Sequence, residues 1–223
     1  MKKSISHLVE TKISAMPMLE SFLARGLVNQ SALARDLLPE LEDELCIEVN
    51  PQAVIMAVKR YTKAAQDSKF EEKINDVLRE CTVNLKSGVA DISVEKTNDI
   101  FTILNEISKK VDTKKGELLS VIQGVSEISI IIEEKHADTL LKKLQGKKIL
   151  VEERDAVELH IMAPPSWWDI PGIISHVTRQ ISIHGINIID IVSTTTELSI
   201  LVRKKDATHA FEALNKLIEQ SKS

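Results

Sequence analysis

The residues best suited to bind a ligand lie in two short segments of the C-terminal third of the chain. Asp169, Pro171 and Gly172 stand where a helix is predicted to begin, and Asn187 opens the strand that follows it. A helix N-terminus presents amides without partners in the helix, and its dipole favours a carboxylate. Asp169 and the amide of Asn187 could receive an ammonium group. These residues therefore suit a zwitterion such as a free amino acid.

A purely structural role for the same residues remains open. In that alternative, Asp169 caps the helix and Asn187 turns the chain. Trp167 and Trp168 come directly before the helix and could plug the pocket, form its wall or anchor an interface.

A second candidate site is a small basic face made by Lys59, Arg60 and Lys63. A helix is predicted to open at Asn50-Pro51, and no acidic residue lies between positions 52 and 66. Such a face could reach phosphate while the opposite face packs. The stretch VNQSALAR and the later MAVKRYTK resemble the helix-turn-helix core of prokaryotic regulators, which implies DNA as a partner. The alternative is a solvated face of a three-helix docking module.

Other residues offer little chemistry. Cys46 and Cys81 are too few for a disulfide framework or a thiolate metal site, and the seven glycines form no nucleotide-binding motif. The six histidines show no ligand spacing. The acidic run Glu40–Glu44 could attract Mg²⁺, but it lacks alternating ligand spacing and indicates a solvated helix end. No serine has an evident base partner. We therefore expect no catalysis, no cofactor and no metal site.

The composition is that of an ordinary soluble globular protein. Of the 223 residues, 43% are hydrophobic and 28% charged, and the net charge of −4 leaves no overall positive field to draw the chain onto nucleic acid or acidic lipid. No apolar run approaches the roughly 20 residues that span a bilayer, and residues 1–9 lack the apolar core of a signal peptide. We expect a cytoplasmic protein with no membrane partner.

The elements that must position these residues fall into two classes. Residues 1–66 are predicted to form a helical module, with a first helix broken near Pro17, a second capped by Asn29 and interrupted at Pro39, and a third from Pro51. Residues 67–80 are predicted to form a connecting helix.

From residue 81 an α+β pattern of the order βαββαβ appears and then repeats. The predicted units are 81–154 and 155–223, two ferredoxin-like repeats with antiparallel sheets and two helices on one face of each. The second unit ends after its last helix, so it has no fourth strand of its own. The spare segment 81–86, CTVNLK, alternates like a strand, and we expect it to supply the missing edge.

The run DIPGIISHVTRQISIHGINIIDIVSTTTELSILV resembles the ACT domain, most closely the aspartokinase type. The resemblance implies a small-molecule sensor in which backbone groups of Ile173 and Ile188 complete the pocket. The full set of binding residues that it implies is Asp169, Ile170, Pro171, Gly172, Ile173, Asn187 and Ile188. The first repeat lacks Pro-Gly at its helix start, so we expect it to be a scaffold without ligand.

Three functions follow from these observations. The first is a homodimeric regulator in which a small amino acid, bound at the ACT-like repeats, controls DNA binding by the helical module. The second is a non-catalytic regulatory subunit of an amino-acid-pathway enzyme such as aspartokinase. The third is a structural dimerisation protein with a vestigial pocket.

Overall fold

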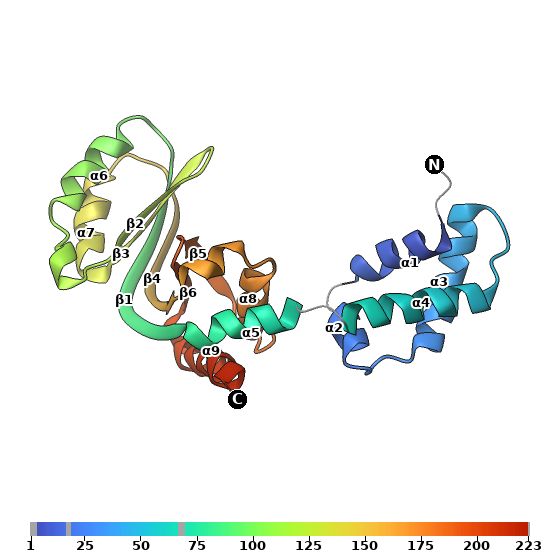
Figure 1. Cartoon of the computed structure of the whole chain (residues 1–223). Helices are drawn as coiled ribbons and strands as arrows, with labels where there is room; N and C mark the ends of the chain where they lie inside the picture. The colour runs from blue at the N-terminus through green and yellow to red at the C-terminus, as the bar shows by residue number, and fades with distance from the viewer. Residues whose placement is uncertain (1–3, 17–18, 67–69, 223) are drawn as a thin grey trace. The chain divides into compact units, whose positions relative to one another are not determined.

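The computed structural model describes residues 4–16, 19–66 and 70–222, which belong to two compact units, Met1–Glu71 and Glu72–Ser223 (Figure 1). Pro17, where the first helix was predicted to break, and residues 67–69 of the predicted connecting helix lie outside the described residues. Among those residues, no helix is both long and apolar enough to cross a membrane.

The N-terminal unit consists of helices around one apolar core. The helices are α1 (Ile5–Ser14), α2 (Leu19–Ala24), α3 (Gln30–Leu45) and α4 (Pro51–Gln66). The predicted cap of the second helix is confirmed, because Asn29 Oδ1 accepts hydrogen bonds from the backbone N–H groups of Ser31 and Ala32 at 3.1 and 3.0 Å. The predicted start of the third helix at Pro51 is also confirmed.

The prediction that Pro39 interrupts the second helix is wrong. Helix α3 continues through Pro39 to Leu45 and ends at Cys46, which has a left-handed φ of 54°. An internal proline costs a helix about 3 kcal/mol through the lost hydrogen bond and the ring clash. Leu37 and Leu41, on either side of Pro39, are fully buried in the core. Their burial offsets the cost of the proline, since each contributes on the order of 2 kcal/mol.

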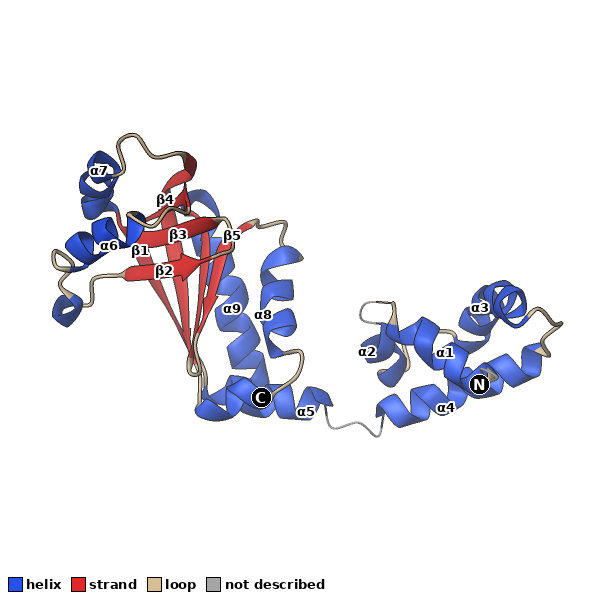
Figure 2. Cartoon of the chain, turned by 90° about the horizontal axis from the view of Figure 1, so that it is seen from above, coloured by secondary structure: helices blue, strands red, loops and turns tan. Residues whose placement is uncertain are grey.

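The C-terminal unit is built on one antiparallel sheet of six strands in the order β2-β3-β1-β4-β6-β5 (Figure 2). The bounds of its strands are β1 (Thr82–Glu95), β2 (Leu119–Gln123), β3 (Glu127–Glu133), β4 (Ile149–Met162), β5 (Ile188–Ser193) and β6 (Glu197–Arg203). Helices α6 (Ile100–Ser108) and α7 (Glu134–Lys143) pack on the first half of the sheet. Helices α5 (Phe70–Glu80), α8 (Ile173–Ser182) and α9 (Ala207–Lys222) pack on the second half.

The two long strands β1 and β4 each belong to both halves of the sheet. Val89–Glu95 pairs with β3, whereas Thr82–Ser87 pairs only with the second half of β4, Val157–Met162. The hypothesis that the segment before the first repeat supplies the missing edge of the second is confirmed for residues 82–86, while Cys81 is a buried residue just before the strand. The two repeats therefore share one sheet, and β4 runs across the predicted boundary at 154.

Both shared strands bend at a residue with positive φ. Gly88 has a φ of 73° and Asp155 a φ of 57°, and the β1–β4 pairing shifts register near both. These residues occupy equivalent places, because each immediately precedes the half-strand that enters its own repeat. A bulge with positive φ increases local twist, so the two halves of the sheet turn toward each other.

The helix-free faces of the two halves meet. Ser129 on β3 lies 3.3 Å from the carboxylate of Asp190 on β5, although three strands separate β3 from β5 in the sheet. Val89, Ile131, Ala156 and Leu201 form a separate buried cluster on this inner face. The sheet is thus curled, and its helix-free face is partly closed by contacts between its two halves.

The two tryptophans before α8 have opposite environments. Trp167 is 1% exposed within the core beneath α8 and α9, whereas Trp168 is 63% exposed. Trp167→Ala should therefore reduce the free energy of unfolding by roughly 3–5 kcal/mol. Trp168→Ala is the matched control and should stay within about 0.5 kcal/mol. Equal effects of the two substitutions in urea unfolding would contradict this placement.

Candidate functional site

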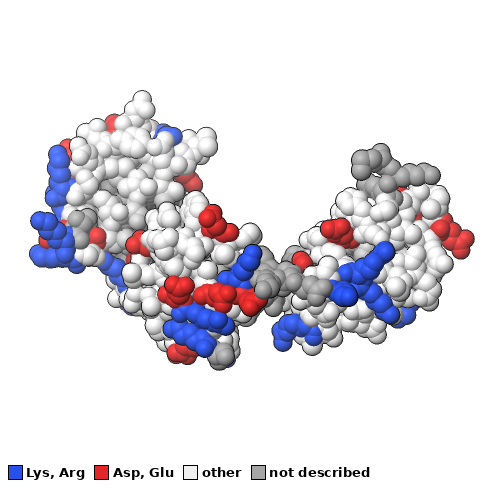
Figure 3. All heavy atoms as spheres, in the orientation of Figure 1, with Lys and Arg blue, Asp and Glu red and all other residues white. Residues whose placement is uncertain are grey.

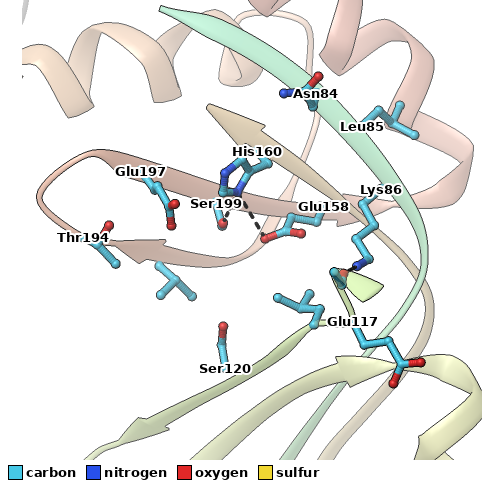
Figure 4. Close-up of a pocket in the computed structure, with 13 residues that line it drawn as sticks. Asn84, Leu85, Lys86, Glu117, Ser120, Glu158, His160, Thr194, Glu197 and Ser199 are labelled. Atoms are coloured by element: carbon cyan, nitrogen blue, oxygen red, sulfur yellow. Dashed lines mark hydrogen bonds and ion pairs between the residues drawn. The ribbon is translucent and has the colours of Figure 1, made fainter. Parts of the chain in front are cut away.

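The curled sheet encloses an open pocket of about 380 Å³ (Figure 4). Its walls come from the first half of β1, the second half of β4, the strands β5 and β6 with their connecting turn, and strand β2 with the segment that leads into it. The lining residues are Asn84, Leu85, Lys86, Gly116, Glu117, Leu118, Ser120, Glu158, His160, Val192, Thr194, Glu197 and Ser199. The pocket therefore combines residues of both repeats.

Glu158, His160 and Ser199 point into this pocket from neighbouring strands (Figure 4). His160 Nδ1 lies 3.2 Å from Ser199 Oγ and 3.8 Å from Glu158 Oε1. A charge relay to a serine nucleophile uses both ring nitrogens, one toward the carboxylate and one toward the hydroxyl. Here both contacts use the same nitrogen, so the arrangement suits binding rather than nucleophilic catalysis.

Two of the charged residues in the lining are neutralised by partners of their own. Lys86 Nζ lies 2.8 Å from Glu133 and donates to the carbonyl of Gly116. Glu117 accepts hydrogen bonds from Lys135, from the backbone N–H of Asp112 and from His136, and these lower the pKa of Glu117 to about 2.

The other two carboxylates in the lining, Glu158 and Glu197, have weaker partners. Within the described ranges, the only ion-pair contact of Glu158 is the 3.8 Å approach of His160, and Glu197 makes none. The lining of the pocket contains one lysine, Lys86, and three glutamates, so its negative side chains outnumber its positive ones.

The first repeat has an equivalent carboxylate in a different environment. Asp91 and Glu158 each stand three residues after the bend of their strand, and Ser129 and Ser199 each stand two residues after the first residue of β3 and β6. Asp91 is buried and accepts a 2.8 Å hydrogen bond from Ser129 Oγ. Burial raises the pKa of Asp91, and the nearby charges of Asp190 and Glu153 raise it further. The first repeat thus satisfies its carboxyl internally.

The predicted corner at the start of α8 has the expected backbone. Gly172, with a φ of 77°, is the N-cap residue of α8, and no side chain in the described part of the chain caps this helix. Asp169 ends the short helix Pro165–Asp169 and is exposed, so the alternative in which Asp169 caps α8 is wrong. Pro171 and Gly172 are also exposed, while Ile170 and Ile173 pack on the core.

The structure does not bring Asn187 to this corner within one repeat. Asn187 is exposed and Ile188 half-buried at the start of β5, which follows the C-terminal end of α8. Helix α8 has 10 residues and is therefore about 15 Å long. A ligand could touch both segments only if they came from different copies of the chain.

The predicted DNA-binding residues lie on one helix but in a mixed environment. Lys59, Arg60 and Lys63 are exposed on α4. Arg60 Nη2 donates to Ser6 Oγ and lines a groove together with Glu10 and Glu20 of other helices. Figure 3 shows acidic as well as basic side chains on this unit. Glu10 of α1 and Glu20 of α2 weaken the positive potential that a phosphate needs.

Sequence reasoning missed the pocket of Figure 4. One signal was present, because Glu158 and His160 alternate with apolar residues in β4, and the motifs SEIS and TELS place Ser129 and Ser199 at matching positions. Such alternation places Glu158 and His160 on the same face of their strand. The curl of the sheet, which turns that face into a pocket, depends on Gly88 and Asp155 together and is not visible in either repeat alone.

No known protein-family model matches the chain, and no curated protein matches it either. Solved structures do. Aspartate kinase from Clostridium acetobutylicum is 16% identical over 61% of this chain and 34% of its own, with a TM-score of 0.50. Aspartate kinase from Synechocystis is 15% identical over 63% and 27%, also at 0.50. The regulatory subunit of aspartate kinase from Thermus thermophilus is 18% identical over 60% and 95%, at 0.48.

These likenesses show the fold. The C-terminal unit has a tandem ACT-like α+β fold, similar to that of part of these aspartate kinases, and a helical region precedes it. The predicted fold class is confirmed.

Asp91 provides a test of the inner face through pH. The pKa of Asp91 is raised above 3.8 in the folded state, so between 3.8 and the raised pKa the native protein binds more protons than the unfolded chain. The free energy of unfolding therefore falls as the pH rises through this range. Asp91→Asn removes this loss and keeps an oxygen to accept from Ser129. We expect the melting temperature of the variant to exceed that of the wild type by a few degrees at pH 7, with the difference shrinking toward pH 4. A constant difference across this range would contradict the burial of a charged Asp91.

Proposed function

We propose that this protein is a non-catalytic regulatory protein that binds a small amino acid at its tandem ACT-like unit. The observation that carries the proposal is the shared six-stranded sheet, in which β1 and β4 join two βαββαβ halves, in a fold similar to that of part of the aspartate kinases. The output is control of a partner enzyme of amino-acid metabolism, with the N-terminal helical unit as the docking element.

The amino acid binds at the corner formed by Asp169, Pro171 and Gly172. The exposed Asp169 receives the ammonium group, and the uncapped amides at the start of α8 receive the carboxylate. Asn187 and the backbone of Ile188 complete the site from another copy of the chain, because α8 separates them from this corner within one repeat. The active form is accordingly a homodimer.

The fold offers a route from this corner to the N-terminal unit along the chain. Helix α5 follows α4 in sequence, and its residues Ile74, Val77 and Leu78 pack in the same core as Ile173 of the corner. Strand β1 begins two residues after α5 ends. Binding changes the balance between two arrangements of α5 by the difference in ligand affinity, typically about 1–3 kcal/mol.

The other two functions have less support. Control of DNA binding rests on Lys59, Arg60 and Lys63, and Arg60 is already engaged by Ser6 beside two glutamates. A purely structural dimer needs no exposed polar corner, yet Asp169 and Asn187 are both exposed and polar.

A thermal-shift screen of the twenty amino acids on the full chain tests the proposal. At 100 times its dissociation constant, the right ligand should add about 2.7 kcal/mol to the free energy of unfolding and raise the melting temperature accordingly. Asp169→Asn should abolish the rise. Asp36→Asn, an exposed carboxylate on α3, is the matched control and should retain it. A flat panel with all twenty amino acids would refute an amino-acid sensor.

A further inference from the structure

We infer that the pocket of Figure 4 is a second binding site, separate from the Asp169 corner, that takes the primary ammonium group of a small ligand. The pocket lies between the two halves of the curled sheet, whereas Asp169 lies beyond the end of β4, outside the pocket lining. At about 380 Å³, the pocket has room for a ligand of amino-acid size.

The strongest evidence is the carboxylate of Glu158. Its side chain is only 6% exposed and faces the pocket (Figure 4). Within residues 4–16, 19–66 and 70–222, no hydrogen bond reaches its oxygens, and its one ion-pair contact is His160 Nδ1 at 3.8 Å. The oxygens of Glu158 are not fully enclosed and meet the open pocket. An ammonium group there would give this largely buried carboxylate both an ionic partner and a hydrogen-bond donor.

The charge of the pocket favours a cation. Lys86 is held by Glu133 and by the carbonyl of Gly116, and Glu117 is held by Lys135 and His136. The charges that remain are those of Glu158 and Glu197.

A comparison of the two repeats independently indicates that Glu158 is available to bind a ligand. Asp91, the equivalent of Glu158, receives the hydroxyl of Ser129 at 2.8 Å. In the second repeat, the equivalent hydroxyl of Ser199 instead contacts His160 at 3.2 Å and leaves Glu158 without it. The second repeat also keeps an open space where the first has Asp190 beside Ser129. Glu158, which lacks the serine partner that Asp91 has, is therefore the carboxylate that lines the pocket.

The remaining lining suits an ammonium group better than a metal ion. The described residues contain no group of three or more His, Cys, Asp and Glu side chains placed to hold a metal. An ammonium group has three donors. Glu158 can accept one of them, and the hydroxyls in the lining can accept the others; these are Ser120, Thr194 and Ser199.

Two classes of ligand share this chemistry: a simple amine, and the α-ammonium of an amino acid. They differ in the carboxylate, for which the lining offers the side-chain amide of Asn84. A simple amine would leave this amide unused.

The test titrates the full chain with methylamine, with 1,4-diaminobutane and with the twenty amino acids, at an ionic strength held constant with sodium chloride. Thermal shift and calorimetry report binding. In Glu158→Gln the affinity should fall by roughly 10- to 100-fold, as expected for the loss of a hydrogen bond to a charged group. Asp91→Asn is the control, because it changes the equivalent carboxyl of the first repeat outside the pocket lining.

Binding that is lost in Glu158→Gln and retained in Asp91→Asn and Asp169→Asn supports the site. Response to amines alone assigns it to simple amines, and response to amino acids alone assigns it to them. No response to any of these probes, or equal affinity in Glu158→Gln and wild type, overturns it.

If the Glu158 variant fails to fold, a shift of the His160 ring resonances of the wild type during the titration is the second readout, and its absence overturns the site. Amino-acid binding that depends on Asp169 but not on Glu158 refutes this site and leaves the proposed function intact.

Discussion

The structure depends on one constraint, which is that the long strands β1 and β4 each belong to both halves of the six-stranded sheet. An isolated second repeat would lack its fourth strand and expose an edge, which invites pairing with other chains. Residues 82–87 of β1 remove that exposure by pairing with Val157–Met162 of β4. In return, the first half of β4 pairs with the second half of β1. The second repeat is complete only with the strand 82–87, which is continuous with the first strand of the first repeat, so the unit should fold as one body.

An ion pair stands at equivalent places in the two repeats, but the positive and negative residues are interchanged. Lys86 on β1 lies 2.8 Å from Glu133 at the end of β3, and Glu153 on β4 lies 3.1 Å from Arg203 at the end of β6. Lys86 is opposite Glu158 in the β1–β4 pairing, and Glu153 is opposite Asp91. The sign of the charges is reversed between the repeats. This reversal gives the inner faces of the two repeats different charges. The same two faces also differ in packing, because Asp91 is hydrogen-bonded to Ser129, whereas Glu158 lines an open pocket.

Local rules predicted much of the fold and only part of the site. Strand alternation and caps located the repeat, the edge segment 82–86 and the start of α4, because these depend on neighbours in sequence. The break at Pro39 was wrong because burial of Leu37 and Leu41 outweighs a local penalty. The residues of the pocket could not be gathered from sequence, since they converge only when bends at Gly88 and Asp155 curl the sheet.

The central claim is that β1 links ligand binding in the ACT-like unit to α5 and hence to the helical unit. Hydrogen–deuterium exchange of the full chain, with and without an amino acid that stabilises it, measures this link directly. We expect slower exchange in the backbone of α5 and of residues 82–87. Protection confined to residues around the bound amino acid, with α5 and 82–87 unchanged, would contradict the account.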